Sequence, residues 1–205
     1  MHRHHHPQTY THPSHGKLDL ICFGNPELDR IHADNSDRKT HLYSGGSAAN
    51  TAAAFAGLGG KASLAGCVGD DARGAFLLSK LKRAGVDISH VQTNGYPTTI
   101  NEIHNTPKGR HIVHPTRGIN EFAGNGDVGE CIRSAKAVLA WLRDEKFGCY
   151  ADLAKWNNVP LYVSAHGFNR ERCWIEKHDM RRYDIAAVIG NGHEMMEVSK
   201  HCILE

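Results

Sequence analysis

The sequence has 205 residues, 40% of them hydrophobic, which is enough for one buried core and suits one domain or part of a larger one. Its 24 Lys and Arg residues are interspersed with 22 Asp and Glu residues, and the net charge of +2 gives no basic stripe for nucleic acid. No apolar run approaches the roughly 20 residues of a membrane-spanning helix, and the polar N-terminus does not resemble a secretory signal.

The first 16 residues form a separate compositional segment. They contain six histidines together with prolines and show no apolar periodicity, so we predict a disordered tail over residues 1–16. Clustered imidazoles can hold zinc or nickel, but we favour a low-complexity tail or an expression leftover as the explanation of this composition. A second histidine pair, His111 and His114, lies in a predicted strand, where this spacing places the two rings on opposite faces.

The chain then alternates between strand and helix signals. We predict strands at 18–24, at 62–68 and from Val86 onward, with helices at 47–58 and 73–85. This alternation favours an α/β fold with a mainly parallel, doubly wound sheet, whose ligands bind at the carboxyl ends of the strands.

The second half of the sequence continues the same rhythm. Residues 127–146 have the periodicity of one long helix, but the apolar run AVLAW at 137–141 has the length of a strand, so we divide the segment there. The further elements that we predict are a helix at 144–157, a strand at 160–165, a helix at 169–180, a strand at 184–190 and a last helix after Asn191. We find no linker within residues 17–205.

Two polar segments interrupt the rhythm, at about 30–43 and 98–115. Both show short alternating strands without a helical stripe, and we predict that they pair as a small sheet over the ligand pocket. The six cysteines are spread singly, without CxxC spacing, through segments that otherwise indicate a core. That usage favours a reduced, cytoplasmic setting.

The segment from Gly45 to Phe76 carries the most information in the sequence. Two glycines, Gly45 and Gly46, remove side chains where another group approaches the backbone closely, and Ser47 is a candidate cap for the alanine-rich helix. Asn50 is the single polar amide in the first turn of that helix, which makes it a candidate ligand contact. Spacing alone also fits an ordinary turn before a helix.

Several motifs together resemble the PfkB, or ribokinase-like, carbohydrate and nucleoside kinases. They are GNPELD at 24–29, GGSAANTAAAFAGLGG at 45–60, VGDDARGAFLLSKLKRAGVDISHV at 68–91, GRHIVHPTRGINEF at 109–122 and DIAAVIGNGHEMMEV at 184–198. The resemblance implies a three-layer α/β/α sandwich with a small β lid. GNPELD is most similar to the adenosine-kinase branch, whereas GGSAANTA occurs across sugar and nucleoside kinases, so the branch stays open.

The resemblance also implies roles for individual residues. Asp29 matches an aspartate at the end of the first strand that takes sugar hydroxyls, and Gly45, Gly46 and Asn50 match the substrate-binding glycine pair and asparagine. Asn120 stands in the variable lid loop, where a contact is as plausible as none. By itself, Asp29 is also compatible with a simple turn residue.

ATP and Mg²⁺ are the cofactors that the resemblance implies. Asn191 and Glu194 match an Asn-x-x-Glu pattern that organises magnesium and the phosphates through waters, although the same pair suits a helix cap and its third residue. The family's base and anion hole come from a downstream Gly-Ala-Gly-Asp motif that these 205 residues do not contain. The segment AGNGD at 123–127 is similar to that motif, but it precedes Asn191 in the sequence, whereas the family's motif follows it. A glycine-containing loop in which Asp127 caps the next helix explains this segment.

We therefore expect residues 17–205 to be the N-terminal, substrate-binding part of such a kinase, truncated at the C-terminus. Full-length relatives transfer the γ-phosphate of ATP to a hydroxymethyl group of a sugar or nucleoside, and the resemblance allows a homodimer through the lid. The alternatives are a non-catalytic sugar- or nucleoside-binding or interaction protein on the same scaffold, and a metal-binding role for the histidine-rich tail. We expect no nucleic acid and no membrane as partners.

Overall fold

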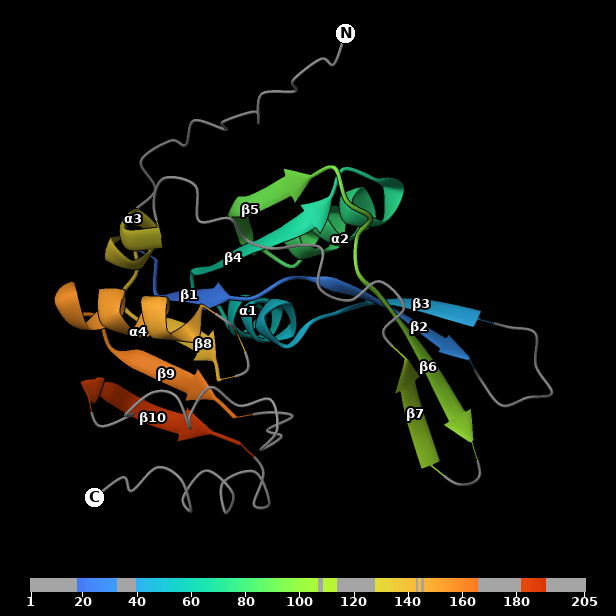
Figure 1. Cartoon of the computed structure of the whole chain (residues 1–205). Helices are drawn as coiled ribbons and strands as arrows, with labels where there is room; N and C mark the ends of the chain where they lie inside the picture. Colours follow the sequence, from blue (N-terminus) through green and yellow to red (C-terminus); the bar gives the residue numbers. More distant parts are fainter. Residues whose placement is uncertain are drawn as a thin grey trace, which may run out of the picture.

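The strands of the described residues form two separate β-sheets (Figure 1). The computed structural model describes residues 18–32, 40–106, 109–113, 128–142, 144, 146–165 and 182–190. Predictions for the N-terminal tail, for the helix at 169–180 and for the helix after Asn191 lie outside these residues. His111 lies in a strand, whereas His114 is also outside them.

The large sheet has six strands in the order β10-β9-β8-β1-β4-β5, and every neighbouring pair is parallel. The strands are β1 (Leu20–Phe23), β4 (Ala62–Gly69), β5 (Asp87–Asn94), β8 (Val138–Trp141), β9 (Leu161–Ser164) and β10 (Ile185–Ile189). The chain adds strands on one side of β1 with β4 and β5, then on the other side with β8, β9 and β10. The predicted parallel, doubly wound sheet is confirmed, and its topological switch point lies between β1 and β8.

Helices cover both faces of the large sheet. They are α1 (Ser47–Gly57), α2 (Ala72–Arg83), α3 (Val128–Arg133) and α4 (Phe147–Trp156). Alternate residues of β1 show the division: Cys22 packs in a core cluster with α1 and α2, whereas Ile21 and Phe23 pack with α3 and α4. The predicted three-layer α/β/α arrangement is thereby confirmed.

The start of α1 differs from the prediction. Gly46, not Ser47, occupies the capping position, with a φ of 92°, and no side chain caps the helix. Ser47 is the first helical residue, and its carbonyl accepts a hydrogen bond from the Thr51 hydroxyl at 2.9 Å. A φ in this region suits only glycine well, so the glycine takes the position that the hydroxyl residue was expected to hold.

The small sheet has four strands in the order β3-β2-β6-β7. They are β2 (Glu27–His32), β3 (Thr40–Gly45), β6 (Ile100–Thr106) and β7 (Gly109–Val113). β2 and β6 are parallel neighbours, and β3 and β7 pair antiparallel to them on either side. Leu28 and Ile100 anchor this sheet in a cluster with Leu77 of α2. Its action as a lid stays a prediction.

The described cysteines are free thiols. Cys22, Cys67 and Cys131 are buried and Cys149 is exposed. Burial raises the pKa of Cys22 to about 12 and that of Cys67 to about 11. These two thiols are therefore apolar core groups at neutral pH. No helix in the described part of the chain is long and apolar enough to span a membrane.

Candidate functional site

Asp29 lies close to Gly45. It is the third residue of β2, so the expectation that it ends the first strand is wrong; β1 already ends at Phe23. A side chain at Gly45 would place its Cβ 2.5 Å from Cγ of Asp29. The Asp29 carboxylate occupies the space that a side chain at position 45 would need, which explains the glycine there. The fold thus brings these two predicted site residues together.

The second glycine has a different neighbour. A Cβ at Gly46 would lie 2.5 Å from the carbonyl oxygen of Asn25, in a backbone conformation that already favours glycine. The close approach that the glycine pair predicts is thus made by the chain itself at both positions. Contact of either glycine with a substrate stays a prediction.

The first turn of α1 lies at the topological switch point. Asn50 is exposed there, and its backbone N–H donates to the Gly46 carbonyl at 2.9 Å. A hollow of about 10 Å³, room for one water molecule, is lined by this turn and by the carboxyl ends of β1, β8 and β9, including Phe23, Trp141 and Ser164. Open α/β sheets bind their ligands at this point, outside the carboxyl ends of the strands.

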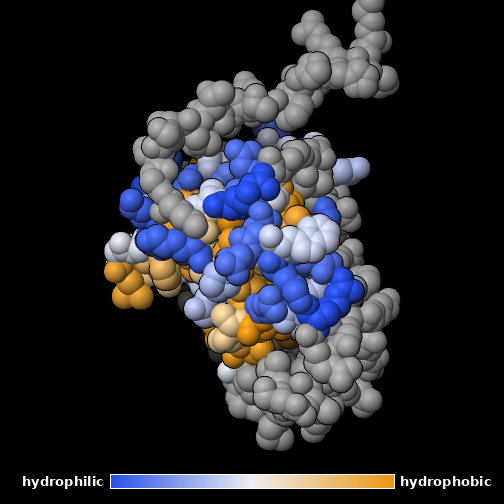
Figure 2. All heavy atoms as spheres, turned by 90° about the vertical axis from the view of Figure 1, so that its left-hand side faces the viewer, coloured by the Kyte–Doolittle hydropathy of each residue, from blue (hydrophilic) through white to orange (hydrophobic). Residues whose placement is uncertain are grey.

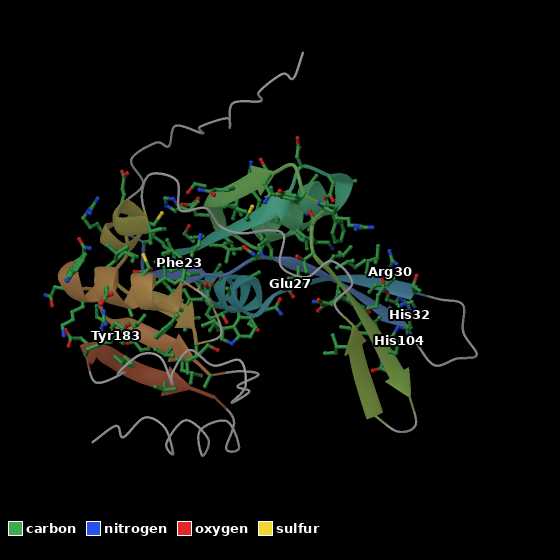
Figure 3. All side chains as sticks on the ribbon, viewed as in Figure 1. Phe23, Glu27, Arg30, His32, His104 and Tyr183 are labelled. Carbon is green, nitrogen blue, oxygen red and sulfur yellow. The ribbon has the colours of Figure 1, made fainter. Side chains whose placement is uncertain are left out.

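Sequence reasoning missed two polar residues beside Asp29. The buried Asn101 of β6 is the register partner of Asp29, and its Nδ2 donates to Asp29 Oδ1 at 2.8 Å. The same nitrogen donates to Glu27 Oε2 at 2.7 Å. Figure 3 shows Glu27 where the small sheet meets the large one. The sequence signal for this contact was a polar residue, Asn101, between the apolar residues of a strand. Its partner could not be predicted, because the neighbouring strand β2 lies far away in the sequence.

The remaining predicted site residues cannot be compared with this geometry. Asn120, Asn191 and Glu194 lie outside the described residues, and so does the Asp127 of the decoy motif. Within the residues that are described, no group of three or more His, Cys, Asp or Glu side chains has the arrangement to hold a metal ion.

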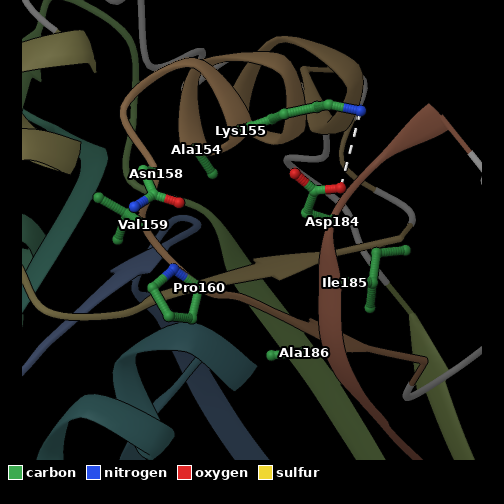
Figure 4. A pocket seen from close by; sticks show the side chains of 8 residues that line it. All are labelled: Ala154, Lys155, Asn158, Val159, Pro160, Asp184, Ile185 and Ala186. Carbon is green, nitrogen blue, oxygen red and sulfur yellow. Dashed lines mark ion pairs between the residues drawn. The ribbon is translucent and has the colours of Figure 1, made fainter.

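A second hollow lies at the opposite edge of the large sheet. It has a volume of about 430 Å³ and is lined by the end of α4, the loop before β9 and the start of β10 (Figure 4). Lys155 and Asp184 approach within 3.7 Å there. Figure 2 views this amino edge, where hydrophilic residues dominate the coloured surface. Of the predicted site residues that the structure describes, none lines this hollow, so it is separate from Asp29 and Gly45.

Residues 17–155 match the pfkB family of carbohydrate kinases, more than half of the chain. The protein belongs to this family. Its sequence is 37% identical over 115 residues to an ATP-dependent ribose-1-phosphate kinase of Halopiger xanaduensis, covering 55% of this chain and 38% of the relative. It is 40% identical over 82 residues to a 5-dehydro-2-deoxygluconokinase of Geobacillus kaustophilus, covering 38% of this chain and 24% of the relative.

Solved structures of sugar kinases have the same fold as this chain. The solved structure of a 2-dehydro-3-deoxygluconokinase from Thermotoga maritima matches with a TM-score of 0.74 at 15% identity, covering 89% of this chain and 61% of that one. The pfkB protein described here thus has the ribokinase-like fold that its sequence motifs indicate, and it spans well under half the length of the two curated relatives.

Proposed function

We propose that this chain binds a sugar, or a nucleoside through its sugar, at the carboxyl edge of the large sheet beneath the small sheet. In the proposed reaction, the γ-phosphate of ATP is transferred to a hydroxymethyl group of that substrate. The observation that carries the proposal is the family match of residues 17–155, which includes every predicted site residue from Asp29 to Asn120.

The chemistry of Asp29 supports a hydroxyl-binding role. The carboxylate is half-buried, and Oδ1 accepts from Asn101 while Oδ2 receives no hydrogen bond within the described part of the chain. An ionised carboxylate accepts hydrogen bonds from hydroxyls more strongly than a neutral group does, and two adjacent hydroxyls suit its two oxygens. The proposed substrate therefore presents its hydroxyls to β2.

Asp29→Ala tests this role. We expect the variant to bind sugar or nucleoside about 2 kcal/mol or more weakly, because a charged hydrogen-bond partner is lost from a half-buried site. Titration calorimetry with ribose, fructose and adenosine measures the change. Arg30→Ala is the matched control, since Arg30 lies on the opposite face of the same strand and pairs with Glu102. Equal affinity of Asp29→Ala and the parent would remove Asp29 from the site.

A binding protein without chemistry is the second candidate function. It would use the same pocket, the Asp29 carboxylate beside Gly45 at the carboxyl edge of the large sheet. Both candidates require the same substrate affinity and differ only in turnover. The roles of Asn191 and Glu194 toward magnesium and phosphate, and a homodimer through the small sheet, likewise belong to the proposal.

A further inference from the structure

Three polar side chains meet beside Gly45 in the small sheet. Glu27 and Asp29 are two residues apart on β2 and so share one face, and Asn101 stands next to Asp29 on β6. Only 6% of Asn101 is exposed. Its Nδ2 donates to Glu27 Oε2 at 2.7 Å and to Asp29 Oδ1 at 2.8 Å.

This arrangement uses both hydrogens of the Asn101 amide nitrogen. A carboxamide nitrogen carries two hydrogens, and each of them reaches a different carboxylate. Two carboxylates this near repel one another, and the amide nitrogen that lies between them donates a hydrogen bond to each. The shared amide therefore fixes the orientation of both carboxylates on this face of the sheet.

The two carboxylates retain acceptor capacity. Within the described residues, Glu27 Oε1 and Asp29 Oδ2 receive no hydrogen bond, and neither carboxylate forms an ion pair. On the same face, β3 contributes Tyr43 opposite Asp29 and His41 two residues further along. A second polar cluster, formed by Arg30, Glu102, His32 and His104, lies on the other face of the sheet.

We propose that Asn101 is a positioning residue that holds the side chains of Glu27 and Asp29 side by side, and that Glu27 accepts a substrate hydroxyl beside the one accepted by Asp29. This inference rests on the proposed function, because it assumes that the substrate lies against β2. It adds Glu27 as a specificity-determining residue. The pair selects a ligand with two neighbouring hydroxyl donors.

Asn101→Asp is the sharpest test, since it keeps the shape of the side chain and replaces the two donor hydrogens by a third carboxylate. We expect the affinity for the tightest-binding of ribose, fructose and adenosine to fall at least tenfold at pH 7.5. The affinity should then recover as the pH is lowered to 5.5, because a proton shared among the three carboxylates restores a donor. The parent protein should show constant or falling affinity over the same range.

Glu27→Gln provides a second test that does not depend on the folding of Asn101→Asp. We expect this variant to bind the same ligand at least fivefold more weakly. We also expect the loss of affinity to depend on one particular hydroxyl of the ligand, the one that Glu27 accepts. A monodeoxy analogue lacking that hydroxyl should bind the parent weakly and bind Glu27→Gln no worse than the parent. Glu102→Gln is the matched control because Glu102 adjoins Asn101 on the opposite face, and its affinity should be unchanged.

The outcomes separate this inference from the proposed function. If Asp29→Ala leaves binding unchanged, the proposed function fails and this inference with it. If Asp29→Ala weakens binding while Glu27→Gln binds every analogue as the parent does, the inference alone is overturned. Thermal melts of each variant at both pH values establish that the compared proteins are folded, and an unfolded Asn101→Asp leaves the decision to Glu27→Gln.

Discussion

Asp71 and Thr98 are joined by two hydrogen bonds. The carboxylate of Asp71 accepts from the Thr98 amide at 2.9 Å and from its hydroxyl at 2.7 Å, and it also caps α2 through the amide of Gly74 at 2.8 Å. One side chain thereby ties the start of a helix on the large sheet to the segment leading into β6. It fixes the strand that carries Asn101.

Asp71→Ala should lower the free energy of unfolding by about 2 kcal/mol, the sum expected for a lost helix cap and lost hydrogen bonds to a charged group. Urea denaturation followed by circular dichroism measures the change. Asp70→Ala is the control, because Asp70 is the exposed neighbour and no hydrogen bond of its side chain is found among the described residues. If Asp70→Ala lowered the free energy of unfolding by as much, the loss in Asp71→Ala would come from the removed charge and not from the hydrogen bonds.

The same carboxylate predicts a pH dependence of stability. Burial by itself would raise the pKa of Asp71, but the hydrogen bonds from Gly74 and Thr98 outweigh it and hold the pKa below its ordinary value of 3.8. The ionised form therefore stabilises the folded state fully above about pH 5, and this contribution is lost as the pH falls through about 4 toward the lowered pKa.

Comparison with Asp71→Asn isolates this effect, because asparagine can still cap the helix but does not titrate. The difference in unfolding free energy between parent and Asp71→Asn should shrink between pH 6 and pH 3. A difference that stays constant across this range would show that Asp71 does not carry the linkage.

Gly45→Ala should weaken sugar binding without greatly changing the fold. The added methyl group would occupy the space of the Asp29 carboxylate, which must then turn away from its hydrogen bond with Asn101. Calorimetry with the ligand used for Asp29→Ala measures the loss, which we expect to reach about tenfold, or about 1.4 kcal/mol. Gly57→Ala in α1 is the control, because no atom lies within 4 Å of a Cβ there. If Gly45→Ala bound the ligand as tightly as the parent, the proposed dependence of binding on the close approach of Gly45 and Asp29 would be contradicted.

The 205-residue chain should not transfer phosphate from ATP to ribose, fructose or adenosine above background, because the sequence contains no Gly-Ala-Gly-Asp motif. Losing the base costs about 10² to 10⁴ in rate, and losing the anion hole a further factor of about 10² to 10³. Coupled ADP release with magnesium present tests this. Turnover that disappears in Asp127→Asn would instead make Asp127 the base.

Local signals in the sequence were sufficient to predict most of the large sheet. The run AVLAW within a helix-like segment was correctly assigned to a strand, β8, because β-strands of parallel sheets are buried on both faces and contain continuous apolar residues. Capping at α1 was predicted wrongly because a hydroxyl residue and a glycine compete for the same position, and only the backbone angle at Gly46 decides between them.

The site was harder to predict because its residues meet through pairing of distant segments. Asp29 was expected at a strand end, since GNPELD continues directly from the apolar run of β1, and nothing local shows that a new strand starts at Glu27. The contact of Asn101 with Asp29 depends on the register between β2 and β6, which no local pattern specifies.

The path of the chain through the two sheets also has a consequence for folding kinetics. β2 and β6 are neighbours in the small sheet although paired residues such as Arg30 and Glu102 are 72 positions apart, and α1, β4, α2 and β5 lie between them in the sequence. The intervening βαβ units have shorter loops to close, so we expect them to form first and the β2–β6 pairing to form late. Substitutions in that pairing should accordingly accelerate unfolding and leave the folding rate almost unchanged.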